Sequence, residues 1–375
     1  MAVKDIVQLE IISEIHDTVN LNYVTRAKIY PDDPDSLYLT MRGDPETNTG
    51  GGISVYNVAN SREPVFLSHL NVADSVPGET INPNQLEGQD RIGNTLVLIA
   101  LEAGIVHVVD ASDPSQLRVS GSIALQGVDE GLGFFPALHT KIYKPSDSNK
   151  TYALVTSSKS SKLVAVDISD PENPRQVSDL QTGISDLEGL YVKGSYVYCG
   201  GFQSDVFLTV DLTDIEHMRL SNMLKKSYYN NMIAELDVND GDILFVSSYM
   251  ERKGYDDKAP DRGGLIVFDI SQPDQPVEIS QVILPELAGS NRVKVHEGYA
   301  YLPIEPIEKD DGLPREPGGI GIVNVSDPHH VVFNNVIKST EAIKPYALVC
   351  KDNYLYVMGS ESNTLVVKEI IKGNT

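Results

Sequence analysis

The chain has 375 residues, with 53 acidic and 30 basic side chains and a formal charge of -23. This negative charge disfavours nucleic acid and anionic membranes as partners, because binding to phosphate groups needs basic patches. No stretch approaches the roughly 18 consecutive apolar residues of a membrane helix, and the N-terminus lacks the basic and apolar segments of a secretory signal. We therefore expect a cytoplasmic protein. Its two cysteines, Cys199 and Cys350, fall in non-adjacent repeat units, which argues against a disulfide.

The first predicted element in chain order is a short strand at residues 6–15, which contains the sequence Ile-Ser-Glu-Ile. The same pattern, an apolar residue, Ser, any residue and an apolar residue, recurs at residues 67–70, 177–180, 220–223 and 279–282. Each of these later copies ends a strand-rich unit. The N-terminal strand therefore has the pattern of the last strand of a unit whose earlier strands are missing.

A second phrase recurs along the rest of the chain. It is an apolar run that ends in Asp or Asn and continues with small polar residues and often Pro, as in LVAVDISDPENP and LIVFDISQPDQP. The marked positions are Asn57, Asp110, Asp167, Asp211, Asp269 and Asn324, with Lys368 in a seventh, degenerate copy. Two further strand-like runs, rich in β-branched and aromatic residues, precede each copy. The Asp-Pro phrase is most simply a turn, since Asp bonds the following backbone and Pro restricts φ.

Four short strands per unit and a period of about 50 residues predict an all-β fold, a seven-bladed β-propeller with four antiparallel strands per blade. We expect a single domain over residues 1–375. The last unit has only three strands, so residues 6–15 should supply the fourth and close the ring, which leaves only short, protected sheet edges. The expected blades are residues 23–74, 85–128, 136–183, 186–230, 231–286, 289–341, and 343–371 together with 6–15.

The phrase VDISDPENP following LVAV resembles the LVIVD-repeat family of β-propellers. The resemblance covers about residues 22–371, and six of the seven units carry a recognisable phrase. It implies a propeller scaffold and no particular activity, because function resides in a site and not in the fold. The chain contains no Trp, which argues against WD-type blades.

Propeller ligands usually bind at the mouth of the central channel, where the interblade loops and the loops between second and third strands meet. The loops between second and third strands are long in blades one, five and six, at residues 41–52, 248–264 and 303–319. Long ordered loops are more often functional than not, although flexible decoration is an alternative. We therefore expect a site on this face.

An alignment of the seven first strands places one polar residue per blade at the channel mouth. These residues are Arg26, Glu87, His139, Glu188, Glu235, Arg292 and Tyr346. They divide into an acidic side from blades two to five and a basic side from blades six, seven and one. The plainest interpretation is a water-filled channel whose ionic side chains pair across the ring.

The functional interpretation is a polar pocket. Glu87, His139, Glu188 and Glu235 are candidate ligands of a divalent metal ion such as Mn, Fe, Zn or, less well, Ca. Alternatively, Glu188, His139, Glu235 and Tyr346 are candidate catalytic acid–base groups, because closely placed carboxylates raise the pKa of one of them.

Arg26 and Arg292 are candidates to clamp a substrate carboxylate or phosphate. Phe134 and Phe135 are candidates for an apolar wall, with core contacts as an equal alternative. The leading hypothesis is a pocket for a small polar or anionic molecule, with hydrolase, lyase or isomerase chemistry as its enzymatic form. The alternative is a non-catalytic scaffold that binds a protein partner through its long loops.

Overall fold

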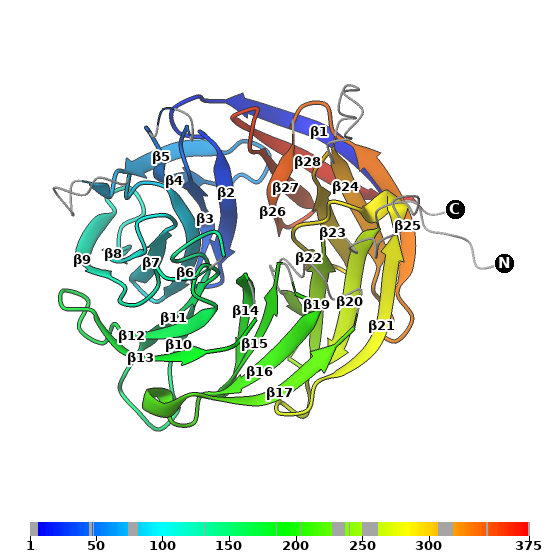
Figure 1. The fold of residues 1–375 in the computed structure, drawn as a ribbon. Helices are drawn as coiled ribbons and strands as arrows, with labels where there is room; N and C mark the ends of the chain where they lie inside the picture. Colours follow the sequence, from blue (N-terminus) through cyan, green and yellow to red (C-terminus); the bar gives the residue numbers. More distant parts are fainter. Residues whose placement is uncertain are drawn as a thin grey trace.

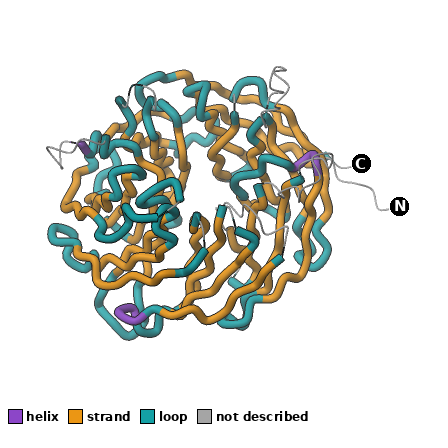
Figure 2. Tube along the Cα trace, viewed as in Figure 1, coloured by secondary structure: helices purple, strands orange, loops and turns teal. Residues whose placement is uncertain are grey.

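The computed structural model describes the chain except for residues 1–6, 45–46, 48, 74–81, 132, 185, 203, 227–236, 240, 250–261, 307–317, 343 and 374–375. Its strands form seven four-stranded antiparallel sheets arranged around a central axis (Figure 1). The predicted seven-bladed all-β propeller is therefore confirmed. Figure 2 shows loops and turns at the ends of the strands. Among the described residues, no helix is long and apolar enough to cross a membrane.

The sheets follow one another along the chain. Blade one consists of β2 (Val24–Tyr30), β3 (Asp33–Met41), β4 (Gly52–Asn57) and β5 (Val65–Leu70), and blade two of β6 (Leu86–Ile92), β7 (Thr95–Ala100), β8 (Ile105–Asp110) and β9 (Arg118–Ala124). Blade three consists of β10 (Thr140–Tyr143), β11 (Tyr152–Ser157), β12 (Lys162–Asp167) and β13 (Arg175–Gln181). Blade four consists of β14 (Leu187–Lys193), β15 (Tyr196–Gly201), β16 (Val206–Asp211) and β17 (Arg219–Lys225). Blade five consists of β18 (Asp237–Asn239), β19 (Ile243–Ser248), β20 (Gly263–Asp269) and β21 (Val277–Leu284). Blade six consists of β22 (Lys294–His296), β23 (Tyr299–Ile304), β24 (Gly319–Asn324) and β25 (Val332–Lys338). Blade seven consists of β26 (Pro345–Lys351), β27 (Tyr354–Gly359), β28 (Thr364–Lys372) and β1 (Val7–His16). Among the described residues, the 3-10 helices η2 (Ile215–His217) and η4 (Pro285–Leu287) follow β16 and β21.

The middle strands of the blades are buried on both faces. In blade three, β11 and β12 are almost wholly buried, whereas the outermost strand β13 is only partly so. Apolar side chains of neighbouring blades pack against each other, as where the rings of Phe207 (β16) and Phe268 (β20) stack with centroids 4.3 Å apart. Two-sided burial explains why these strands have continuous apolar sequences instead of strict alternation.

The two repeated sequence phrases meet where neighbouring blades touch. The Ser of the fourth strand donates a hydrogen bond to a carbonyl in the Asp-Pro turn of the next blade. Ser68 Oγ donates to Pro114 O at 2.6 Å, and Ser280 Oγ donates to Pro328 O at the same distance. Both sequence phrases therefore take part in the contact between blades, and the Asp-Pro phrase also forms the turn.

The last sheet joins the two ends of the described chain. Its strand order is β26, β27, β28 and β1, and β1 pairs antiparallel with β28 along its length. Ser13 Oγ of β1 donates to Arg62 O of blade one at 2.8 Å, which is the contact that fourth strands make elsewhere. β1 thus holds the outermost position of the seventh sheet.

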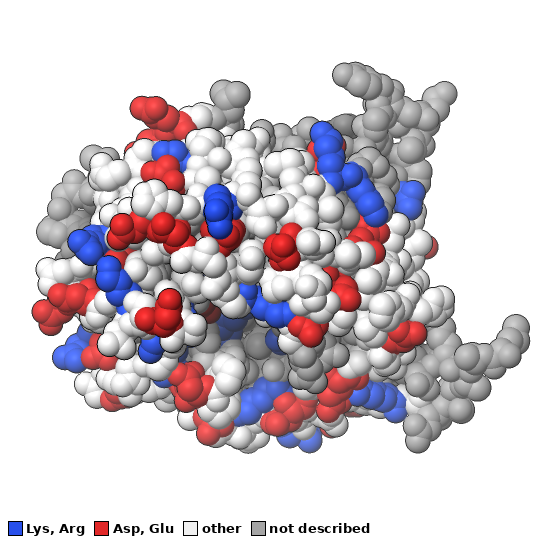
Figure 3. All heavy atoms as spheres, turned by 90° about the horizontal axis from the view of Figure 1, so that it is seen from below, with Lys and Arg blue, Asp and Glu red and all other residues white. Residues whose placement is uncertain are grey.

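The acidic composition is distributed over the surface. Figure 3 shows Asp and Glu side chains interspersed with Lys and Arg over one side of the molecule. Interspersed charge of this kind keeps a protein soluble and contributes little to stability.

Candidate functional site

A cavity of about 300 Å³ lies where the blades converge. It brings together seven of the residues that the sequence singled out: Glu87, His139, Glu188, Arg292, Tyr346, Phe134 and Phe135. Glu235, predicted as a catalytic group and metal ligand, lies outside the described residues. Glu87, Glu188 and Tyr346 lie in first strands, and His139 and Arg292 lie just before them.

Local irregularities in the first strands present these side chains. Glu87, Glu188 and Tyr346 each lie at a β-bulge close to the start of β6, β14 or β26. A bulge leaves a residue outside the regular pairing and re-aims its side chain. Gly88 follows Glu87, and a Cβ on Gly88 would come 2.8 Å from Leu138 O, so glycine lets blades two and three approach closely here.

Arg26 lies one residue beyond the position that the alignment assigned to it. Val24 pairs with Met41 at the end of β3, so the bulged residue of this strand is Thr25, whose hydroxyl donates to a backbone carbonyl of blade two at 2.8 Å. Arg26 is 4% exposed and does not line the cavity. The extra residue of the bulge is the reason, because an alignment of short strands by sequence pattern does not reveal it.

Glu87 is the counter-charge of three arginines. Its Oε2 accepts from Arg42 Nη2 at 2.7 Å and from Arg42 Nε at 2.9 Å, while Oε1 lies 3.0 Å from Arg292 Nη2 and 3.3 Å from Arg26 Nη2. Burial acts to raise the pKa of Glu87, but the three guanidinium groups outweigh it, and the net pKa is lowered. Glu87 is therefore ionised at neutral pH.

This arrangement differs from the separate acidic and basic sides expected from the sequence. Arg26 contacts both Glu87 and His139, which were assigned to the opposite side. The described residues contain no group of three or more His, Cys, Asp or Glu side chains suited to a metal ion. Glu87 is the ion-pair partner of the arginines. The predicted metal site stays a prediction, because Glu235, one of its four ligands, lies outside the described residues.

His139 stands directly before β10 and accepts a hydrogen bond from a buried guanidinium. Its ring nitrogens face Arg26 Nη2, with Nδ1 at 3.2 Å. Burial and then the neighbouring positive charge of Arg26 hold the pKa of His139 well below its usual range. His139 is thus a neutral imidazole that accepts from arginine.

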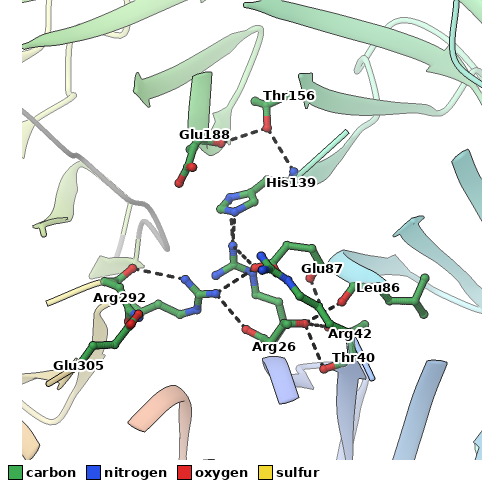
Figure 4. A network of polar contacts seen from close by, with 12 residues as sticks. Arg26, Thr40, Arg42, Leu86, Glu87, His139, Thr156, Glu188, Arg292 and Glu305 are labelled. Atoms are coloured by element: carbon green, nitrogen blue, oxygen red, sulfur yellow. Dashed lines mark hydrogen bonds and ion pairs between the residues drawn. The ribbon is translucent and has the colours of Figure 1, made fainter. Parts of the chain in front are cut away.

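The carboxyl of Glu188 has no hydrogen-bond partner among the described residues. The backbone carbonyl of Glu188 accepts from Thr156 Oγ1 at 3.1 Å, and the side chain faces the open centre beside His139 (Figure 4). Glu188 is only 9% exposed. Burial, with the nearby charge of Glu87, raises the pKa of Glu188 to about 8. At neutral pH this carboxyl is mostly protonated.

Aromatic rings form one wall of the cavity. Phe134 lies against Phe135 and Phe202, with centroids 6.1 and 6.3 Å apart, and Phe202 lies 5.9 Å from Tyr249. The guanidinium of Arg42 is 5.3 Å from the ring centre of Phe135. The cavity therefore presents aromatic faces beside the guanidinium of Arg42, an arrangement that suits ligands with both apolar and charged parts.

Several lining residues were missed from the sequence. Arg42, Phe202, Tyr249 and Glu305 each follow directly the last residue of a second strand, namely β3, β15, β19 or β23. The signal was available, since each is the first residue of a loop between second and third strands. Loop length marks three of these four loops in the sequence but does not mark the residue that lines the cavity.

Glu305 forms a second polar group at the rim. Its carboxylate accepts from Asn291 Nδ2 and lies 3.7 Å from Lys344 Nζ. Burial raises the pKa of Glu305, with Lys344 partly opposing the shift. Two of the three cavity carboxyls, Glu188 and Glu305, are therefore easier to protonate than an exposed Glu.

The sequence comparisons identify the repeat. The family model of the LVIVD repeat matches residues 151–182 and 259–283, so the chain contains LVIVD repeats, as the resemblance implied. The first match spans β11 to β13 of blade three. No curated protein matches this sequence.

Solved structures share the fold at low sequence identity. A putative 6-phosphogluconolactonase from Bacteroides fragilis is 12% identical with a TM-score of 0.61, covering 88% of this chain and 87% of that one. Virginiamycin B lyase from Staphylococcus aureus is 9% identical with a TM-score of 0.61, covering 97% and 100%. The periplasmic gluconolactonase of Pseudomonas aeruginosa is 13% identical with a TM-score of 0.59, covering 89% and 88%. At these identities the likeness concerns the fold alone.

Proposed function

We propose that this propeller binds a small organic anion in its central cavity. The observation that carries the proposal is the cluster of three arginines around one carboxylate at the cavity. Arg42, Arg292 and Lys344 line the cavity and Arg26 lies beneath it, against the carboxyls of Glu87, Glu188 and Glu305. Lys344 pairs with Glu305 and Glu361, whereas Arg26, Arg42 and Arg292 share the single carboxylate of Glu87. The arginine cluster therefore carries two excess positive charges when Glu188 is neutral and one when Glu188 is ionised.

The cavity size and its charge support a small ligand over a metal ion. A volume of about 300 Å³ is at the lower end for ligand pockets. Guanidinium groups suit carboxylate and phosphate oxygens, and a buried cation beside several arginines would be repelled. The ligand class is therefore a carboxylate or phosphate of modest size.

An enzymatic form of this proposal assigns acid–base work to Glu188. It is the cavity carboxyl with a pKa of about 8, close to the operating pH, and it faces the ligand space. His139 and Tyr346 would then position the ligand. The lactonases and the lyase with this fold support hydrolase or lyase chemistry here only as part of the proposal.

The alternative scaffold hypothesis rested on long loops. Large parts of these loops, residues 250–261 and 307–317, lie outside the described residues. The cytoplasmic location and the lack of nucleic-acid or membrane partners likewise stay predictions from composition.

The test is calorimetric titration with acetate, citrate, inorganic phosphate and glucose 6-phosphate, with Arg42→Gln and a matched control. Arg42 is partly exposed at the cavity, and its loss removes one charge-assisted hydrogen bond, so anion affinity should fall by about ten- to a hundredfold. Arg118→Gln, which removes a surface arginine paired with Asp110, should leave affinity unchanged. Equal affinities for both variants, or no binding of any anion, would refute the proposal.

A further inference from the structure

We propose that the anion carries an apolar, planar body, which packs against the aromatic wall, and that Glu188 binds it as the neutral carboxylic acid. This inference rests on the proposed function and names its ligand class and its proton dependence. It makes Glu188 a specificity-determining hydrogen-bond donor.

The aromatic wall is the first observation. Phe134 is 56% exposed, although a ring of this size usually lies in a core. Its contacts are the rings of Phe135 and Phe202, and the chain of rings continues to Tyr249. None of these four belongs to the buried clusters between blades that the described residues form. An apolar ligand body would cover the exposed face of Phe134, and removing this apolar surface from water would favour binding.

The charged end of the ligand has a defined place beside this wall. The side chains of Arg26 and Arg292 are 4% and 1% exposed, whereas that of Arg42 is 20% exposed. Arg42 also stacks near Phe135 at 5.3 Å. Arg42 is therefore the most exposed of the three arginines, and it places the anionic group next to the rings.

Glu188 is a further polar group that lines this space. It is nine-tenths buried, points into the centre and has no hydrogen-bond partner among the described side chains (Figure 4). An unpartnered buried carboxyl costs free energy, and less so in its neutral form. A ligand oxygen that accepts its proton would satisfy it.

The charges around Glu188 favour the neutral form once an anion is present. Glu87 and Asp186 oppose its ionisation, whereas Arg26 and Arg292 favour it. Both arginines already bind Glu87, and His139 beside Glu188 is neutral. An incoming anion adds a further negative charge, so it raises the pKa of Glu188 above its value of about 8 in the free protein. Anion binding near pH 8 is therefore accompanied by proton uptake.

The protonation of Glu188 gives anion affinity a pH dependence of defined direction. Below the pKa of free Glu188 the carboxyl is already neutral, and affinity is independent of pH. Above that pKa the free protein must regain a proton to bind, so affinity falls by up to about tenfold per pH unit. The fall continues until the pKa of the complex is reached.

The experiment is isothermal titration calorimetry of the full chain between pH 6 and 9.5, in buffers of different ionisation enthalpy. The probes are benzoate and phenylacetate, with acetate and inorganic phosphate as anions that lack an apolar body. The variants are Glu188→Gln, which keeps the shape and a donor but does not titrate, and Phe134→Ala. The control is Phe66→Ala, which removes an exposed ring on outer strand β5.

We expect an aromatic acid to bind at least about tenfold more tightly than acetate, and Phe134→Ala to remove most of this advantage while Phe66→Ala does not. Affinity of the unmodified protein should fall above pH 8 with uptake of about one proton, and Glu188→Gln should bind without this pH dependence. Phosphate binding without aromatic-acid binding, or the same pH profile in Glu188→Gln, would overturn the inference and leave the proposed function standing. If none of these anions nor those of the earlier titration binds, the proposed function fails as well.

Discussion

Replacement of Glu87 by Gln should destabilise the protein by about 3–5 kcal/mol at pH 7. The change removes one negative charge and keeps the size of the side chain. It leaves Arg26, Arg42 and Arg292 without their shared counter-charge, and the new amide NH₂ group must face guanidinium donors. The cost therefore comes from uncompensated buried charge and not from a cavity.

The magnitude follows from the burial of the network. The side chains of Glu87 and Arg292 are each 1% exposed and that of Arg26 is 4% exposed, so water screens these charges little. Removing one partner of a buried ion pair costs about 3–5 kcal/mol, whereas an exposed pair is worth about 0–1 kcal/mol. Partial exposure of Arg42, at 20%, lets it recover solvation and keeps the expected cost within this range.

The pH dependence of the same variant has a defined direction. The folded-state pKa of Glu87 is depressed below its ordinary value of 4.5, so its contribution to stability is present above that pH. It is lost as the pH falls through the folded-state pKa. The difference between the unmodified protein and Glu87→Gln should therefore shrink as the pH falls through the folded-state pKa of Glu87.

Urea unfolding followed by circular dichroism at pH 7 and at pH 4 provides the measurement. The control is Glu297→Gln, which breaks a surface pair with Lys372 at 2.6 Å and should cost less than about 1 kcal/mol. A cost for Glu87→Gln no larger than that of Glu297→Gln would show that the three arginines do not need this carboxylate, and would refute the reasoning.

Two predictions concern the ring. Deletion of residues 1–16 removes β1 and exposes the edge of β28, so we expect a lower melting temperature and aggregation by size-exclusion chromatography; an unchanged melting temperature would contradict this. Ser280→Ala removes the hydrogen bond to Pro328 O between blades five and six, which should lower the free energy of unfolding by about 0.5–1.5 kcal/mol in urea titrations, whereas no loss would mean that the interblade contact is replaced by water.

Repeated local patterns determined the architecture. The fourth-strand Ser and the Asp-Pro turn recur because the same interblade contact recurs, as at Ser68 with Pro114 and at Ser280 with Pro328. Six of the seven blades are built from four consecutive strands, so their strands and turns follow from short stretches of sequence. This is why seven blades were predictable from residue patterns alone.

The cavity was predictable only in part. Aligned first strands identified Glu87, His139 and Glu188 correctly as residues of the central cavity, because blade symmetry repeats their position. The same alignment assigned Arg26 to the position at the channel mouth that Thr25 occupies. The β-bulge adds one residue to this strand, and nothing in the composition of the strand marks it.

Only the tertiary structure decided which charges meet. Glu87 and Arg292 are 205 residues apart in sequence, and Arg26 and His139 are 113 apart, yet each pair is in contact. The sequence shows that carboxylates and arginines reach the channel, but their pairing depends on side-chain reach across the ring. Glu87 therefore pairs with all three arginines, whereas the carboxyl of Glu188 has no hydrogen-bond partner among the described residues, and this difference in pairing separates their pKa values.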